Sequence, residues 1–316
     1  TVMIAILLGI IMGNAFTPRP GMMIGLDFTQ KYILKLGIIF LGIRLGFVDF
    51  FKFGTVAIPL IIVCILSVLI LIKLLIKKVP ISSKMSYLIA IGTSVCGATA
   101  IVAVAPVIEA KKTEVAYAIA NITLFGVIAM LLYPYFAEWY FYGEPIMAGL
   151  FLGTAIHETS QVAAAGLIYD QQFNSPETLN VATVTKLIRN TFLVILVPLF
   201  GFLYNRGKVK DKNYSIFSIF PYFVLGFIGM IVVRNIGDQI FTLENGNYEL
   251  WKTLINYIKS LATVFLTMAM AAVGISINLN ELKSMGYKPF VVGLIAAVTV
   301  GIVSIVSLET FLKVFL

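Results

Sequence analysis

Residues 54–76 read GTVAIPLIIVCILSVLILIKLLI, an apolar run with a single charged residue, Lys73. A helix that crosses the hydrocarbon core of a bilayer needs about 20 such residues. The whole chain of 316 residues is 60% hydrophobic and only 12% charged, whereas a soluble domain has about 25% charged residues. Too little polar surface remains to cover a soluble globule of this size. The sequence therefore predicts a polytopic membrane protein.

Nine further apolar segments accompany this one, at residues 2–14, 31–47, 85–108, 115–141, 145–169, 178–204, 215–235, 253–277 and 288–312. None alternates as a membrane β-strand does, so we expect an all-α fold of about ten transmembrane helices. The short connections predict one transmembrane domain over residues 1–316, without a soluble domain. The first segment is short and the chain begins at Thr1. We therefore expect part of the native N-terminus, with another helix, to be missing, and no cleavable signal is recognisable.

The basic residues between these segments predict the orientation of the chain, because cytoplasmic loops carry an excess of lysine and arginine. If all ten segments cross the membrane, twelve basic residues fall on one side and seven on the other. Loops 73–84 and 206–212 supply most of the excess. We expect these two loops to be cytoplasmic and both ends of the chain to lie on the opposite side. The net charge of +8 is then a matter of topology and does not indicate nucleic acid binding.

Five charged residues are interpreted as lying deep in the apolar segments and are not assigned to a loop: Lys35, Arg44, Lys186, Arg189 and Glu158. Each costs about 2.5–3.5 kcal/mol at the centre of a helix on insertion scales. They should therefore face the bundle interior, a watery cavity or a charged ligand. Their excess of positive charge favours an anionic ligand. Lys35 is expected at the interface, and Arg44, near a helix end, either lines a pathway or extends to the interface.

The stretch GTAIHETSQVAAAG at residues 153–166 places five consecutive polar residues, His157 to Gln161, inside an apolar segment. In a continuous helix Thr154, Gln161 and either His157 or Glu158 share one face. The same run also fits an unwound centre between two half-helices, where backbone and polar side chains surround a ligand. A polar contact between helices is the simpler alternative. His157 and Glu158 form a pair that titrates near neutral pH when buried, which proton coupling requires.

The letters HETSQ begin like the zinc-protease motif HExxH. Gln161 stands where that motif has its second histidine, and His157 is the only histidine in the chain. A zinc site is not expected with so few ligands, and no cofactor is predicted. The two cysteines, Cys64 and Cys96, lie in apolar runs and are interpreted as buried free thiols.

A second polar group is Lys186-Leu-Ile-Arg189-Asn190, whose polar members lie on one helical face. Arginine offers a planar fork that matches carboxylate or sulfate oxygens, and lysine offers a compact charge. Together these two residues would nearly balance a divalent oxyanion. The alternative is structural, with Lys186 extending to the interface and Arg189 paired with Glu158.

A third group is GTSVCGATA at residues 92–100. Gly97, with Thr93, Ser94 and Thr99 around it, suits a discontinuous helix whose free N–H groups and hydroxyls bind an anion. Small residues that let helices pack closely are an equally good interpretation.

Weak internal similarity is also present. Gly42-Ile43 matches Gly274-Ile275, and Gly92-Thr93 matches Gly153-Thr154. The first match joins segments of opposite direction and favours an inverted repeat. The two matches do not fit one five-plus-five repeat together.

Three segments carry a family resemblance: SVCGATAI at 94–101, TAIHETSQVAAAG at 154–166, and Lys186-Leu-Ile-Arg189. In these, and over almost the whole chain, the sequence resembles the sulfate exporter family of YeiH-like bacterial inner-membrane proteins. That family looks like a member of the larger grouping of bile-acid, arsenite and riboflavin transporters. The resemblance implies about ten helices, inverted repeats, and two discontinuous helices that cross near the membrane centre. It also implies a location in the bacterial plasma membrane.

The leading hypothesis is a secondary active transporter that exports a small anion, sulfate or a related sulfur oxyanion, by alternating access and proton- or sodium-coupled antiport. His157 and Glu158 would couple protons, and Arg44 would line the pathway. Whether the protein forms a homodimer is left open. Apart from the transported ions, the expected partner is the lipid bilayer. The expected substrate-binding residues are Lys186, Arg189, Thr93, Ser94, Gly97, Thr99, Gln161 and Asn190.

Three alternatives stay open. A cation/proton antiporter is weakened by the presence of one deep acid against four bases. An intramembrane enzyme would use His157, Glu158 and a hydroxyl such as that of Ser94 or Ser160, although we expect transport and not catalysis. A channel is the third alternative. The sequence has no nucleotide-binding loop of the form GxxxxGK[ST], so transport powered by ATP would require a separate subunit.

Overall fold

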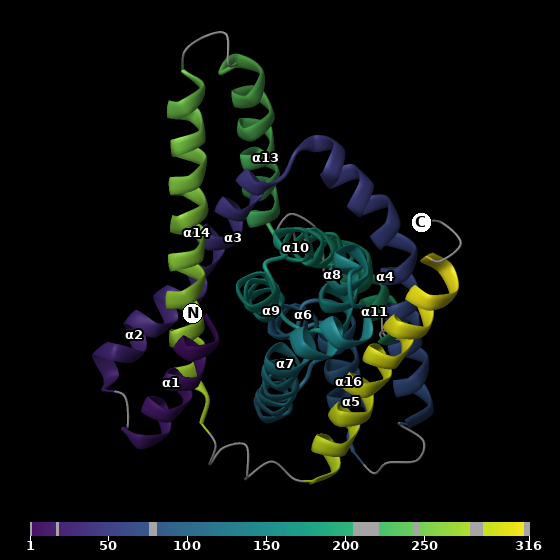
Figure 1. Ribbon diagram of the computed structural model, residues 1–316. Coiled ribbons are helices and arrows are strands. Elements are labelled where there is room, and N and C mark those ends of the chain that lie inside the picture. Colours follow the sequence, from purple (N-terminus) through teal and green to yellow (C-terminus); the bar gives the residue numbers. More distant parts are fainter. Residues whose placement is uncertain are drawn as a thin grey trace.

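The computed structural model describes residues 2–16, 19–75, 81–204, 221–242, 247–278 and 287–312, and every regular element within them is a helix (Figure 1). In chain order the elements are α1 (Val2–Ala15), α2 (Pro20–Phe28), η1 (Thr29–Ile33), α3 (Leu34–Leu41), η2 (Gly42–Arg44), α4 (Phe47–Leu75), α5 (Ser83–Ser94), α6 (Ala98–Val104), α7 (Lys112–Tyr140), α8 (Pro145–Ala155), α9 (Thr159–Phe173), α10 (Pro176–Thr191), α11 (Leu193–Tyr204), α13 (Phe223–Ile240), α14 (Tyr248–Ser276), α16 (Tyr287–Ser307) and η4 (Leu308–Leu312).

Each of the ten predicted apolar segments overlaps one or more of these helices, which confirms the all-α membrane fold. Among the described residues, 6 helical stretches are long and apolar enough to cross a membrane. They are Phe47–Leu74, Lys112–Tyr140, Pro176–Phe200, Phe223–Ile240, Tyr248–Ser276 and Tyr287–Thr310. The count of about ten crossings stays a prediction. So does the orientation, because loop 206–212 and residues 76–80 lie outside the described residues.

The helices form two groups that lie side by side (Figure 1). In the flanking group, α14 packs against α1 and α3, and α3 also packs against α13. In the central group, α10 packs against α8, α9 and α4, while α16 covers α4, α5, α7 and α8. The flanking group comprises α1, α2, α3, α13 and α14, and the central group comprises α4 to α11 and α16.

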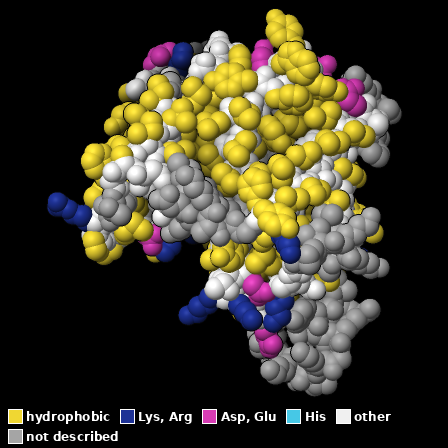
Figure 2. Space-filling view, turned by 90° about the horizontal axis from the view of Figure 1, so that it is seen from below, with side chains coloured by type: hydrophobic (Ala, Val, Ile, Leu, Met, Phe, Trp, Pro, Cys, Tyr) yellow, Lys and Arg dark blue, Asp and Glu magenta, His cyan; other side chains and the backbone are white. Residues whose placement is uncertain are grey.

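The outer surface is suited to lipid. Figure 2 shows a broad area of hydrophobic side chains over the upper part of the view, with charged side chains gathered at its edges and below it. Large apolar side chains such as Ile11, Leu132 and Val306 are exposed. A contiguous apolar exterior of this kind is unstable in water and stable in a bilayer.

Glycines allow two helix backbones of the flanking group to come close together. A Cβ atom on Gly13 would lie 2.1 Å from the carbonyl oxygen of Ile275, and one on Gly274 would lie 2.4 Å from that of Ile6. The backbones of α1 and α14 therefore touch, as small residues allow in membrane helix pairs. Asn14 adds a hydrogen bond from Nδ2 to the carbonyl oxygen of Ile277 at 2.8 Å.

We expect Gly13→Val to destabilise the packing of α1 on α14, because the new side chain would overlap backbone that cannot move aside. The expected loss is about 1–3 kcal/mol or more, measured as a lower midpoint of thermal unfolding in detergent. Gly21→Val is the matched control, since a Cβ atom at Gly21 meets nothing within 4 Å. Equal midpoints for the two variants would contradict this account of the contact.

Candidate functional site

Two helices of the central group are interrupted at their centres. The first ends as α5 at Ser94 and resumes as α6 at Ala98, and the second ends as α8 at Ala155 and resumes as α9 at Thr159. The predicted unwound centres are therefore confirmed, and a continuous helix through His157 is wrong. Gly97 allows the first break, because its φ is +63° and a Cβ atom there would lie 2.4 Å from Cγ of Glu158. The same contact brings the two breaks together.

The broken ends of α5 and α8 leave buried carbonyl groups without helical partners. Lys186 on α10 satisfies two of them, since its Nζ donates to the carbonyl oxygens of Val95 and Ile156, each at 2.8 Å. One of these oxygens comes from each break. The ammonium group therefore joins the two interrupted helices.

Arg189, one turn further along α10, satisfies three more carbonyl groups. Its Nε donates to Ser94 at 2.7 Å, Nη2 donates to Thr93 at 2.5 Å, and Nη1 donates to Thr154. Arg189 and Lys186 are both fully buried. Cations at the C-terminal ends of helices also complement the helix dipole. Both side chains thus stabilise the breaks directly, in addition to any role toward a ligand.

The acidic side chain of Glu158 lies at the N-terminal ends of α6 and α9, the helices that follow the two breaks. Oε1 of Glu158 accepts from the backbone N–H of Ala98 at 3.3 Å, at the start of α6, and Glu158 is itself the N-cap residue of α9. Oε1 of Gln161 accepts from the N–H of Glu158 at 3.2 Å, while Nε2 donates to the carbonyl oxygen of Thr123 on α7 at 3.3 Å. Among the described residues, no hydrogen bond or ion pair joins Glu158 to His157 or Arg189.

Four buried polar atoms around these breaks have no hydrogen-bond partner: Oγ of Ser94, Nδ1 of His157, Oγ1 of Thr185 and Oδ1 of Asn190. Buried polar atoms nearly always have a partner, and leaving one unsatisfied costs about 1–3 kcal/mol. All four belong to the two breaks or to α10, which packs against α8 and α9. Three of the four were expected from the sequence. Thr185 was not assigned, although its position directly before Lys186 was a usable signal.

The remaining predicted residues separate into those at the breaks and those elsewhere. Thr93 is buried and lies at the first break. Thr99 is exposed on α6, because that short helix turns it away from the buried group, and Lys35 is exposed as well. Cys64 and Cys96 are buried free thiols.

Arg44 lies away from the breaks. Its Nη1 contacts Oδ2 of Asp170 on α9 at 3.1 Å. Asp170 was missed by the sequence reasoning, which took Glu158 as the single deep acid. A signal existed, because Arg44 and Asp170 stand at the ends of the second and sixth predicted segments, and two such ends lie on the same side of the membrane.

A cavity of about 520 Å³ lies between α1, α7 and the end of α14. Its lining is mainly apolar, with Thr123 and Ser276 among the polar members. Thr123 also accepts the hydrogen bond from Gln161. Thr123 therefore connects the cavity to Gln161, the residue whose Oε1 accepts from the N–H of Glu158.

An apolar helical bundle with two interrupted helices, joined by buried cations, defines a polytopic α-helical membrane protein with discontinuous helices. A family model described as "Conserved hypothetical protein 698" matches residues 1–293. The chain belongs to this family, the UPF0324 membrane proteins. No solved structure matches the chain.

Individual relatives cover nearly the whole chain. UPF0324 membrane protein SAG1125 of Streptococcus agalactiae is 35% identical over 305 residues, which is 96% of this chain and 87% of that protein. FN0533 of Fusobacterium nucleatum is 32% identical over 98% of this chain and 90% of its own. The UPF0324 inner membrane protein YeiH of Escherichia coli is 31% identical, with coverages of 92% and 80%.

We expect Arg189→Met to destabilise the protein by at least about 3 kcal/mol, because three buried carbonyl groups lose their donors at about 1–3 kcal/mol each. Ser94→Ala removes a buried hydroxyl that has no hydrogen-bond partner, so it should not lower stability, because no hydrogen bond is lost and an unsatisfied group is removed. Thermal unfolding in detergent compares the two. Similar midpoints would show that Arg189 does not support the breaks.

Proposed function

We propose that this protein is a secondary active transporter that moves a small anion by alternating access between the flanking and central groups. The observation that carries this proposal is the set of unpaired polar atoms on Ser94, His157, Thr185 and Asn190. They belong to the two helix breaks and to α10, the helix that carries the two buried cations. A structural core needs no such unsatisfied groups, whereas a site that binds and releases a polar ligand does.

The charge at the breaks favours an anion. Lys186 and Arg189 carry two positive charges and ionised Glu158 carries one negative charge, while the two N-terminal and two C-terminal helix ends offset each other. One net positive charge remains. Lysine has three N–H donors and arginine five, so the bonds to carbonyl groups leave one donor on Lys186 and two on Arg189 for a ligand.

Protonation of Glu158 would raise the net charge to two positive units and so match a dianion. This supports sulfate, or a related sulfur oxyanion, bound at this site together with a proton, so that the anion and the proton cross in the same direction and not by antiport. The resemblance to the YeiH-like sulfate exporters supports the same substrate class and export as the direction. Glu158 and Thr159 keep partial exposure while His157 is buried, which favours Glu158 as the group that exchanges the proton.

We also propose a location in the bacterial plasma membrane, with loops 73–84 and 206–212 in the cytoplasm. The E. coli relative is named an inner membrane protein, and the lysine-rich loops agree with the expected charge bias.

A cation/proton antiporter is the second candidate. The carbonyl oxygens of Val95 and Ile156, which hold the Lys186 ammonium, are also the kind of ligand that a monovalent cation takes. Sodium-driven flux in vesicles without any dependence on anions would favour this function over anion transport.

We expect Thr185→Val and Ser94→Ala each to weaken anion binding at least tenfold, or about 1.4 kcal/mol, because each removes an unpaired hydroxyl at the site. Calorimetric titration of purified protein with sulfate, sulfite, thiosulfate, taurine and dicarboxylates would measure this and rank the substrates. Ser67→Ala is the control, since that hydroxyl bonds to the carbonyl oxygen of Cys64 within α4. Unchanged affinity in both site variants would refute the site.

We expect Glu158→Gln to flatten the pH dependence of sulfate counterflow in proteoliposomes. The amide oxygen of glutamine can still accept from the N–H of Ala98, so the break keeps its geometry while the side chain no longer titrates. A pH profile like that of the wild-type protein would remove Glu158 from proton coupling and leave anion binding intact.

A further inference from the structure

The chain passes from the flanking to the central group through a short segment between α3 and α4. Gly42–Arg44 form a 3-10 turn, Leu45 is extended with φ −112° and ψ 140°, and α4 begins at Phe47. This connection lies within the described residues, and it interrupts an otherwise helical path. A change in the angle between the two groups would act on this segment.

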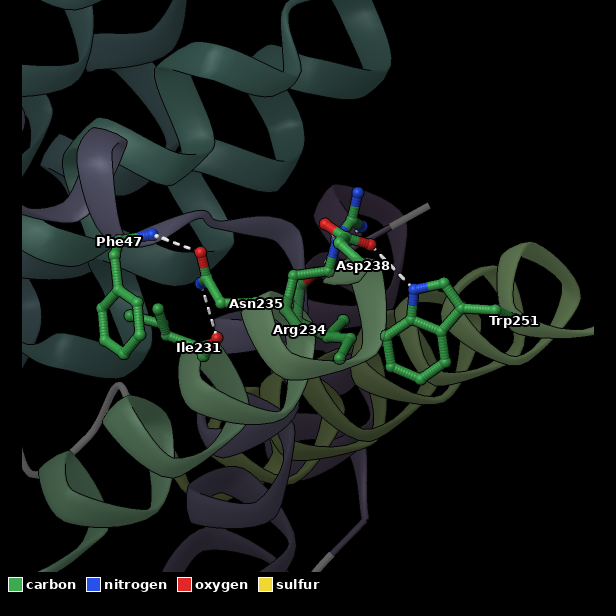
Figure 3. A network of polar contacts seen from close by, with 7 residues as sticks. Phe47, Ile231, Arg234, Asn235, Asp238 and Trp251 are labelled. Carbon is green, nitrogen blue, oxygen red and sulfur yellow. Dashed lines mark hydrogen bonds and ion pairs between the residues drawn. The ribbon is translucent and has the colours of Figure 1, made fainter. Parts of the chain in front are cut away.

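Helix α13 of the flanking group holds the segment on both sides (Figure 3). Oδ1 of Asn235 accepts from the N–H of Phe47 at 3.2 Å, and Nη1 of Arg234 donates to the carbonyl oxygen of Ile43 at 3.5 Å. Oδ2 of Asp238 accepts from Nε of Arg234 at 2.6 Å, and Oδ1 accepts from Nε1 of Trp251 on α14 at 2.7 Å. The flanking group thus determines where this segment and Arg44 lie.

From this fixed position Arg44 reaches across to the central group. Its side chain contacts Asp170 on α9 at 3.1 Å, and the two side chains are 13% and 18% exposed. Lys259 on α14 is half-buried and interacts electrostatically with both residues. Nε of Arg44 is buried without a partner. Three cations, Arg44, Arg234 and Lys259, therefore stand on the flanking side, and Asp170 is the acid that faces them from the central group.

A cavity lies between the two groups toward the other end of the same interface. The cavity between α1, α7 and α14 reaches Ser276 at the end of α14, about 25 Å along that helix from Lys259 at 1.5 Å per residue. The two groups are thus joined by an ion pair near Arg44 and have a cavity between them near Ser276.

We propose that the Arg44–Asp170 pair is a latch that closes the interface between the two groups at the end opposite the cavity. This inference rests on the proposed transport function, in which each end of the interface opens in turn. Breaking the pair leaves Arg44 facing the central group without its counter-charge, while Asp238 still pairs with Arg234 within the flanking group. The closed end should then separate.

The test measures distance and requires no substrate. Spin labels at Gln172 on α9 and Asn256 on α14, both exposed, report the separation by electron–electron resonance after Cys64 and Cys96 are replaced by alanine. We expect Asp170→Asn and Arg44→Gln each to add a longer distance population that is absent from the wild-type chain. The exchanged pair Arg44→Asp with Asp170→Arg should restore the short distance.

Asp27→Asn is the matched control, because the Lys31–Asp27 pair is 67% and 66% exposed and lies within the flanking group. An unchanged distance distribution in both single variants, with thermal unfolding as in the wild type, would overturn the latch. So would failure of the folded exchanged pair to regain the short distance. Because anion binding by the Ser94→Ala and Thr185→Val variants is measured separately, failure of the latch and failure of the proposed function give different results.

Discussion

A helix broken inside a membrane exposes carbonyl groups where no bulk water can satisfy them, and the rest of this structure depends on how that constraint is met. Lys186 and Arg189 meet it by donating to five carbonyl oxygens from two separate breaks. They can do so because α10 lies directly against α8. A Cβ atom on Gly153 would be 2.6 Å from Cβ of Thr185, and one on Gly149 would be 2.6 Å from Cβ of Val181. The glycines of α8 thus set the reach of the two cations.

The helical fold and the positions of both breaks could be predicted, because they follow from local patterns. Apolar runs of membrane length identify the helices, and a polar run at 157–161 or a glycine such as Gly97 marks the place where a helix stops. The use of the two buried cations could not be predicted in this way. Lys186 meets Val95 across 91 positions of the chain, and a count of buried charges does not distinguish a charge that binds backbone from one left for a ligand.

The same limit explains the misplaced and missed residues. Thr99 belongs to the predicted small-residue group, yet it faces outward, because the restart of α6 after Gly97 changes which side of the helix faces the core. Asp170 follows an apolar run and therefore looked like an ordinary interfacial acid. Its partner Arg44 is 126 positions away, so the pairing depends on how two helix groups meet and not on either local sequence.

The unequal charge at the breaks has an electrical consequence. An elementary charge that moves through the membrane potential gains or loses about 2.3 kcal/mol per 100 mV. If the central group carries Lys186, Arg189 and ionised Glu158 between the two faces, the unloaded protein moves one positive charge through that field. A bound monoanion cancels this charge, as does a dianion together with protonated Glu158. The potential would then act on the return of the empty carrier and leave the loaded step nearly unaffected.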